Sequence, residues 1–104
     1  MGVIVVKTLK EFADVNKVKV IIDFYATWCG PCKVISPKFE EYSEKFTNLK
    51  FVKIDVDNSP ELAKKFEIQA MPTFKVVENG NVVDELVGAN PAKLLQLIEK
   101  HDKK

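Results

Sequence analysis

Residues 18–26, with the sequence VKVIIDFYA, constrain the fold of this chain more than any other stretch. Successive side chains of a β-strand point to opposite faces of its sheet, and here both alternating sets of positions are largely apolar. Such a strand is buried on both faces, which is typical of a central strand in a sheet that helices cover on each side. We therefore expect a layered α/β fold built around this strand.

Helix and strand signals alternate along the rest of the chain. Thr8 and Glu11 match a capping box, in which each side chain satisfies a backbone group at the start of a helix. Asn79 and Gly80 favour a tight hairpin turn because both tolerate positive φ. The expected elements, in chain order, are a strand at 3–6, a helix from Thr8 to about Asn16, the strand at 18–26, a helix at 33–46 interrupted by Pro37, a strand at 50–57, a helix capped by Ser59 and starting at Pro60, a hairpin over 73–88, and a helix capped by Asn90 and starting at Pro91.

The order β-α-β-α-β-α-β-β-α predicts the architecture. Alternation in the first half implies parallel strands joined by crossover helices, whereas the late hairpin adds an antiparallel edge. We expect an α/β fold with a central mixed β-sheet and helices on both faces, in a single domain over residues 1–104, close to the commonest domain size. The polar tail from His101 to Lys104 is expected to fray, with His101 exposed to solvent.

Composition and charge exclude several classes of function. The 104 residues are 46% hydrophobic and 30% charged, which is typical of a folded globular chain rather than a disordered one. Sixteen basic and fifteen acidic residues leave a net charge of +1, without the basic surplus of a nucleic-acid-binding protein. No apolar run approaches the ~20 residues of a membrane span, and no signal peptide is recognisable. We expect a cytoplasmic protein that binds neither nucleic acid nor membrane.

The chain has two cysteines, Cys29 and Cys32, separated by two residues. A structural disulfide removes more entropy when it closes a longer loop, so this spacing favours a reactive pair over a staple. The pair follows the buried strand and precedes a helix, where unpaired backbone N–H groups and a partial positive charge favour a thiolate. Cys29 is therefore the expected nucleophile, and Cys32, one turn later and expected to be more enclosed, the resolving thiol. Pro31 is expected to stiffen the turn between them.

The motif Trp28-Cys29-Gly30-Pro31-Cys32 resembles the active site of the thioredoxins, and the similarity extends over the whole chain. It includes residues 20–33 (VIIDFYATWCGPCK), 53–74 (KIDVDNSPELAKKFEIQAMPTF) and 87–89. The resemblance implies the thioredoxin fold and a general protein-disulfide reductase that works by dithiol–disulfide exchange and forms a Cys29–Cys32 disulfide. It also implies a monomer that holds no cofactor of its own. The implied partners are disulfide-containing client proteins and a separate thioredoxin reductase, an NADPH-dependent flavoenzyme.

The resemblance also assigns roles near the cysteines. Asp23 matches a buried acid that exchanges a proton with Cys32, and Lys53 matches a lysine that modulates this acid. Gly30 and Pro31 tune the redox potential; relatives that work as oxidants commonly carry a histidine there, so a reductant is favoured. The residues alone favour a paired or solvated strand-end carboxylate for Asp23, and Lys53 is equally consistent with an exposed lysine.

A second group of residues matches the rim that binds substrate in this family. Trp28 is expected to cover the cysteine pair rather than to lie in the core. Met71 precedes Pro72, which the resemblance implies to be a cis-proline packed against the cysteines. Gly88 and Ala89 match another part of the same rim. Pro37 matches a structural helix kink.

Two other classes of function compete with the enzyme. A C-x-x-C pair supplies half of a zinc site, but four ligands are needed and the chain has no second pair, so only a shared site between two copies would serve. We expect no metal. The chain could also be a binding module with incidental cysteines, in which case both could be replaced by serine without loss of function. Metal analysis and an insulin-reduction assay discriminate among the three.

Overall fold

The structure is a computed structural model that describes residues 2–15 and 18–103. It contains the nine expected elements in the expected order: β1 (Val3–Val5), α1 (Leu9–Val15), β2 (Val20–Tyr25), α2 (Gly30–Lys45), β3 (Lys50–Asp55), α3 (Pro60–Lys65), β4 (Thr73–Glu78), β5 (Asn81–Val87) and α4 (Pro91–His101). The strands form a five-stranded sheet in the order β1-β3-β2-β4-β5. β1, β3 and β2 are parallel, and β4 and β5 join them in antiparallel pairing.

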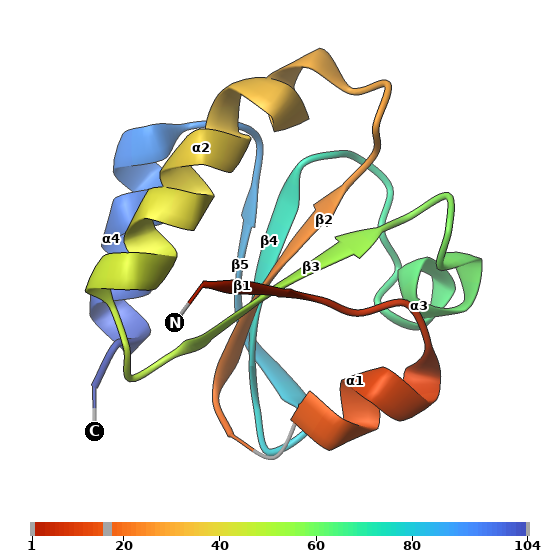
Figure 1. Cartoon of the computed structure of the whole chain (residues 1–104), viewed down its shortest axis with the longest axis horizontal. Coiled ribbons are helices and arrows are strands. Elements are labelled where there is room, and N and C mark those ends of the chain that lie inside the picture. The colour runs from red at the N-terminus through yellow and green to blue at the C-terminus, as the bar shows by residue number, and fades with distance from the viewer. Residues whose placement is uncertain (1, 16–17, 104) are drawn as a thin grey trace.

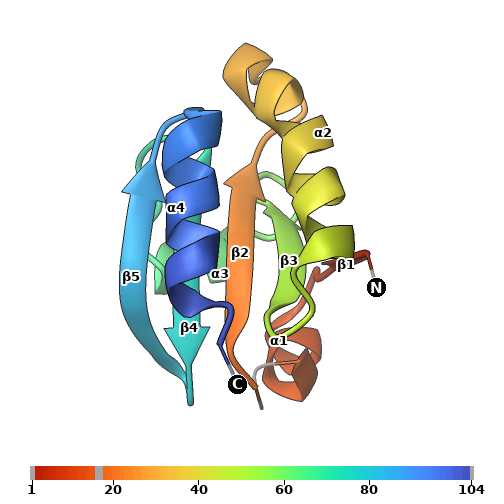
Figure 2. The same cartoon turned by 90° about the vertical axis from the view of Figure 1, so that its left-hand side faces the viewer.

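β2 is the central strand, as its apolar pattern predicts. It pairs with β3 on one side and β4 on the other, and its residues Val20, Ile21, Ile22 and Phe24 are fully buried. Ile21 packs into a core cluster with side chains of α2 and α4, whereas Ile22 packs into a second cluster with side chains of α1 and α3. The sheet therefore lies between two helical layers, with α2 and α4 on one face and α1 and α3 on the other (Figure 1; Figure 2). The predicted mixed sheet with helices on both faces is confirmed.

The helix starts follow local sequence chemistry with one exception. The Glu11 carboxylate accepts from the N–H of Thr8, and the Thr8 hydroxyl accepts from the N–H of Glu11, which confirms the capping box of α1. Asn90 caps α4 by accepting from the N–H of Lys93. Ser59 occupies the N-cap position of α3, but its hydroxyl donates instead to the backbone carbonyl of Lys7 at 2.8 Å. The expected end of the first helix, Asn16, lies outside the described residues.

The C-terminal segment is more ordered than the sequence predicts. His101 is the last residue of α4, and its side chain is only 13% exposed. Its Nε2 lies 2.8 Å from Oδ2 of Asp84 on β5, and Asp102 Oδ1 accepts a 2.8 Å hydrogen bond from the N–H of Asn48. The expected fraying and exposure are therefore wrong for His101 and Asp102, because β5 and the loop after α2 supply partners that are distant in sequence. Lys104 lies outside the described residues.

Candidate active site

The two cysteines lie at the N-terminal end of α2 and are joined by a disulfide bond. Cys29 is the N-cap residue, with an extended backbone (φ −84°, ψ 111°), and its Sγ accepts a 3.2 Å hydrogen bond from the N–H of Cys32. The first N–H groups of a helix have no partner within it and carry a partial positive charge. This environment favours a thiolate at Cys29 once the disulfide is reduced.

The two cysteines differ in their position on α2 and not in their burial. Cys29 is 4% exposed and Cys32 is 3% exposed, so the oxidised protein does not show the greater enclosure expected for Cys32. Cys29 precedes the first turn of α2, whereas Cys32 lies within that turn and lines a cavity behind the disulfide that is partly open to solvent. Gly30 and Pro31 form the start of the helix between them. A Cβ added at Gly30 would meet no atom within 4 Å, so crowding does not require glycine at this position.

The segment from Ala70 to Thr73 lies against the disulfide. The carbonyl oxygen of Met71 is 3.7 Å from Sγ of Cys29, and the Met71–Pro72 peptide bond is cis. Thr73 Oγ1 donates a 2.6 Å hydrogen bond to the carbonyl of Ala70, which closes this turn at the start of β4. The Met71 side chain packs against the cluster formed by Ala26 and the two cysteines.

Gly88 connects the end of β5 to the same segment. Its N–H donates a 2.9 Å hydrogen bond to the carbonyl of Pro72. Its φ of 110° lies in a region that residues with a Cβ adopt only under strain, so the conformation itself requires glycine. Ala89, the next residue, is half-buried and packs against the core cluster beneath α2 and α4.

Trp28 stands beside the disulfide and is 67% exposed, so the expected location outside the core is confirmed. Its Nε1 donates a 2.8 Å hydrogen bond to Oδ2 of Asp57. Asp57 is held in turn by Asp55, whose Oδ1 accepts from the N–H of Asp57 at 2.9 Å. Sequence analysis did not single out either aspartate. The available signal was a pair of acids at the carboxyl end of the third strand, because the carboxyl ends of parallel strands and the loops that follow them meet at one edge of the sheet.

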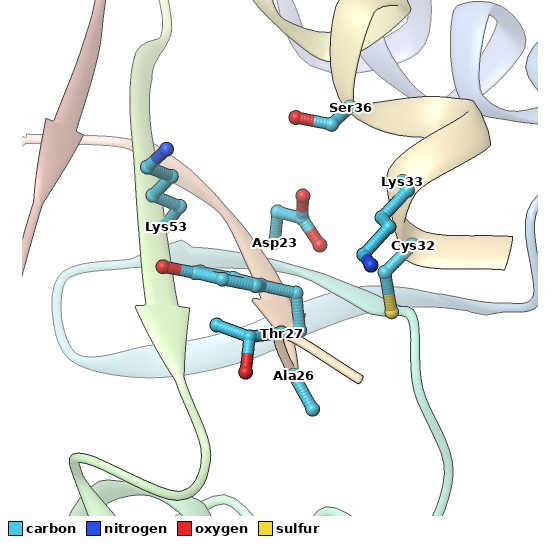
Figure 3. Close-up of a pocket in the computed structure, with 8 residues that line it drawn as sticks. Asp23, Ala26, Thr27, Cys32, Lys33, Ser36 and Lys53 are labelled. Carbon is cyan, nitrogen blue, oxygen red and sulfur yellow. The ribbon is translucent and has the colours of Figure 1, made fainter. Parts of the chain in front are cut away.

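Asp23 lies behind the disulfide, at the base of a cavity of about 230 Å³ that is partly open to solvent. The cavity is lined by Asp23, Tyr25, Ala26, Thr27, Cys32, Lys33, Ser36 and Lys53 (Figure 3). Asp23 is 3% exposed, and among the described residues Oδ1 has no hydrogen-bond partner. Burial raises the pKa of Asp23 from 3.8 to about 7; Lys53 acts to lower this pKa and Glu40 to raise it. The cavity thus places a carboxyl group that titrates near neutral pH alongside Cys32.

Lys53 is the register partner of Asp23 across the β2–β3 pair. The structure gives it no ion pair with Asp23; its Nζ lies 4.0 Å from Oε1 of Glu40 on α2. The same Nζ lies 5.6 Å from the centre of the Tyr25 ring, within the range of a cation–π contact. The alternative in which Asp23 is a satisfied, ion-paired carboxylate therefore has no support among the described residues.

Within residues 2–15 and 18–103, no group of three or more His, Cys, Asp and Glu side chains could hold a metal ion. In the same ranges, no helix has the length and apolar character needed to cross a membrane.

These features define a class of protein. A central strand that leads to a disulfide at a helix N-terminus, with a buried acid behind it and an X-Pro segment against it, is the arrangement of a thiol–disulfide oxidoreductase. The Thioredoxin family model matches residues 3–100. Because that match covers almost the whole chain, the chain belongs to the thioredoxin family.

Individual relatives agree in sequence and in structure. Thioredoxin from Coprinus comatus is 51% identical over 100 residues, which cover 92% of this chain and 94% of the relative. The solved structure of thioredoxin from Malassezia sympodialis matches with a TM-score of 0.94 at 42% identity, over 99% of this chain and 94% of that one. Thioredoxin from Plasmodium falciparum matches with a TM-score of 0.91 at 48% identity, over 94% and 98% of the two chains. The expected fold is confirmed, and the protein is a thiol–disulfide oxidoreductase that reduces protein disulfides.

Proposed function

We propose that Cys29 is the nucleophile and Cys32 the resolving thiol of this disulfide reductase. The Cys29 thiolate attacks one sulfur of a client disulfide, which forms a mixed disulfide and releases the other client sulfur as a thiolate. Cys32 then attacks Sγ of Cys29, which forms the Cys29–Cys32 disulfide and releases the second client thiolate. The client gains two electrons and the cysteine pair loses two. The observation that best supports this assignment is the N-cap position of Cys29, where helix N–H groups stabilise its thiolate.

Asp23 serves as the proton acceptor for Cys32 in the resolving step. The Cys32 thiol must lose a proton before its sulfur attacks, and the cavity that Asp23 and Cys32 both line gives that proton a path, directly or through water. A base works best when its pKa lies near the working pH, and burial raises the pKa of Asp23 to about 7. Lys53, which also lines the cavity, modulates the basicity of the Asp23 carboxylate. Gly30 and Pro31 tune the redox potential in the absence of a histidine between the cysteines.

The client binds along the rim formed by Trp28, Met71, cis-Pro72, Gly88 and Ala89. The Met71 carbonyl beside Cys29 offers a backbone acceptor to an extended client segment, which is a form of strand addition. The exposed indole of Trp28 supplies apolar contact area on the other side of the disulfide. Few of these contacts depend on the client's side chains. The rim can therefore bind many different clients, as a general disulfide reductase must.

Electrons reach this chain from a separate thioredoxin reductase, an NADPH-dependent flavoenzyme. The chain itself needs no cofactor, since the dithiol carries both electrons. It acts in the cytoplasm as a monomer with one domain over residues 1–104, and binds neither nucleic acid nor membrane. The near-neutral charge and the family match over residues 3–100 support this part of the proposal.

Insulin reduction tests the proposed function. With dithiothreitol as electron donor, the chain should accelerate precipitation of the insulin B chain, whereas Cys29→Ser and Cys32→Ser should not. Ser43→Ala, which changes a buried side chain of the same helix outside the active site, should retain the rate. A second arm with NADPH and a thioredoxin reductase tests the electron source separately. Equal rates for the unaltered chain and for the variant with both cysteines replaced by serine would establish the binding-module alternative, and one bound zinc per two chains would establish the shared metal site.

Equilibration with a glutathione redox buffer tests the direction of electron flow. The dithiol should be more reducing than glutathione, so the disulfide should persist until the buffer is strongly reducing. Ready reduction by glutathione would instead make this protein an oxidant or isomerase.

A further inference from the structure

Three polar side chains on one face of α2 form a row along the cavity. The row starts at the disulfide, which we call the inner end, and ends at Lys53, the outer end. Cys32, Ser36 and Glu40 are spaced four residues apart, which places them in a row along the helix. Cys32 and Ser36 line the cavity, and Glu40 extends the row beyond it to reach Lys53. The opposite wall is formed by Asp23 on β2 and Lys53 on β3. Figure 3 shows Lys53 on one side of Asp23 and Cys32 on the other.

Lys53 has two carboxylates within its reach. Its backbone is in register with Asp23, yet its Nζ lies 4.0 Å from Glu40 Oε1 and over the ring of Tyr25. Asp23 Oδ1 meanwhile has no hydrogen-bond partner among the described residues. Lys53, the register partner of Asp23, is thus paired with Glu40 and not with Asp23.

We propose that Glu40 is a positioning residue for the reductase reaction: its carboxylate holds the Lys53 ammonium group at the outer end of the cavity, away from Asp23, and so keeps Asp23 basic enough to accept the Cys32 proton. The inference rests on the role proposed above for Asp23. Glu40 touches neither client nor sulfur and acts only through Lys53 and its own charge.

The charges around Asp23 agree with this arrangement. From β3, Lys53 acts to lower the pKa of Asp23, and from α2, Glu40 acts to raise it. Lys33 on α2 and Tyr25 on β2 are the other titratable groups that line the cavity beside Cys32, and β4 places Phe74 opposite Asp23. Loss of the Glu40 charge therefore lowers the pKa of Asp23 twice: directly, and by releasing Lys53 to turn toward it.

The test compares Glu40→Gln with Glu41→Gln. Glu41 is a neighbouring exposed glutamate that pairs with Lys38 and Lys45, so it controls for loss of a surface charge from the same helix. The titration midpoint of the Asp23 carboxyl, followed by carbon-detected NMR, should fall by about 0.5 pH unit in Glu40→Gln and stay unchanged in Glu41→Gln. The acidic limb of the pH profile of insulin reduction should move with it. Glu40→Asp, which keeps the charge, should restore much of the shift.

A double-mutant cycle with Lys53→Met separates positioning from direct repulsion. If Glu40 acts through Lys53, the Glu40→Gln shift should be clearly smaller in the Lys53→Met background. Equal shifts in both backgrounds, or no shift at all in Glu40→Gln, would overturn the proposal. A shifted Asp23 midpoint with an unmoved pH profile would instead overturn the proton-exchange role of Asp23, and with it the catalytic part of this inference. Urea unfolding of each variant verifies that it is folded.

Discussion

Trp28 and Asp57 are joined by a 2.8 Å hydrogen bond from the indole Nε1 to the carboxylate Oδ2. The bond links the loop after β3 to the residue directly before the active-site disulfide. Because Asp57 is itself held by Asp55, the exposed indole is oriented from the end of a buried strand as well as by the loop in which it lies.

Asp57→Ala should impair client binding without impairing the chemistry of the cysteines. Loss of the hydrogen bond frees the indole to adopt other rotamers, and we expect KM for insulin to rise about fivefold, corresponding to ~1 kcal/mol, with kcat little changed. The emission of Trp28, the single tryptophan, should also change. Asp14→Ala, at an exposed position on α1, is the control. A fall in kcat at unchanged KM would show that Asp57 acts on the sulfur chemistry instead.

Alkylation should distinguish the two cysteines. In the reduced protein at neutral pH, iodoacetamide should modify Cys29 before Cys32, because the thiolate is stabilised at the N-cap position. Peptide mapping after a short exposure measures the ratio. Faster labelling of Cys32 would reverse the assignment of nucleophile and resolving thiol.

Cys32→Ser should trap clients as mixed disulfides, since no thiol remains to release them. Non-reducing electrophoresis after incubation with oxidised insulin would show the adduct. Cys29→Ser is the matched control and should trap far less, because its remaining thiol lies inside the first turn of α2.

Asp23→Asn should raise the stability of the oxidised protein at pH 7. Burial raises the pKa of Asp23 from 3.8 in the unfolded chain to about 7 in the fold. The unfolded chain therefore loses this proton first, and the free energy of unfolding falls as pH rises from about 4 to 7. The penalty reaches about 4 kcal/mol at pH 7. After the cost of burying an amide, we expect a net gain of about 2 kcal/mol.

Urea unfolding at pH 7 and at pH 3 measures the predicted change in the free energy of unfolding and its direction. The advantage of Asp23→Asn should be present at pH 7 and absent at pH 3, where the aspartate is protonated in both states. Asp14→Asn, the control, should leave the free energy of unfolding unchanged at both pH values. The variant should also reduce insulin more slowly at pH 7. A loss of stability at pH 7 would identify Asp23 as an ion-paired carboxylate, and unchanged activity would exclude it as the proton acceptor.

His101→Ala should destabilise the fold in a pH-dependent manner. The hydrogen bond from His101 is the main cause that lowers the pKa of Asp84 below its usual value. An acid whose pKa is lower in the folded state contributes stability above its unfolded pKa, and this contribution is lost as pH falls through the folded pKa. The deficit should therefore be about 1 kcal/mol at pH 7 and should shrink as the pH falls below 3.8, the usual pKa of this carboxyl.

Lys100→Ala is the control for His101→Ala, since Lys100 also contacts Asp84, at 3.2 Å, but is largely exposed. Its effect should be smaller. Insulin reduction should be unchanged in both variants, because the contact joins the last turn of α4 to β5 and includes no residue of the active-site rim. A pH-independent loss in His101→Ala would mean that packing, not the hydrogen bond, carries the effect.

Sequence alone predicted the order of the elements because the signals that specify them are local. The capping box at Thr8 and Glu11, the cap at Asn90 and the turn at Asn79–Gly80 all act within a few residues, and the structure contains each of them. The apolar pattern of residues 18–26 likewise predicted the central strand, although β2 is shorter, from Val20 to Tyr25. The spacing of the cysteines predicted a reactive pair, and their family motif predicted the reaction.

Tertiary structure decided what depends on groups that meet only after folding. Ser59 binds Lys7 rather than its own helix, His101 meets Asp84, and Trp28 meets Asp57 across 29 positions of sequence. The same is true of the buried acid: Asp23 is in register with Lys53, but the Lys53 Nζ lies 4.0 Å from Glu40, which α2 brings near it, and Asp23 Oδ1 has no hydrogen-bond partner among the described residues. A residue's own sequence neighbourhood determines its local conformation, but the pKa of a buried group is determined by its desolvation and by charges that other elements bring near it.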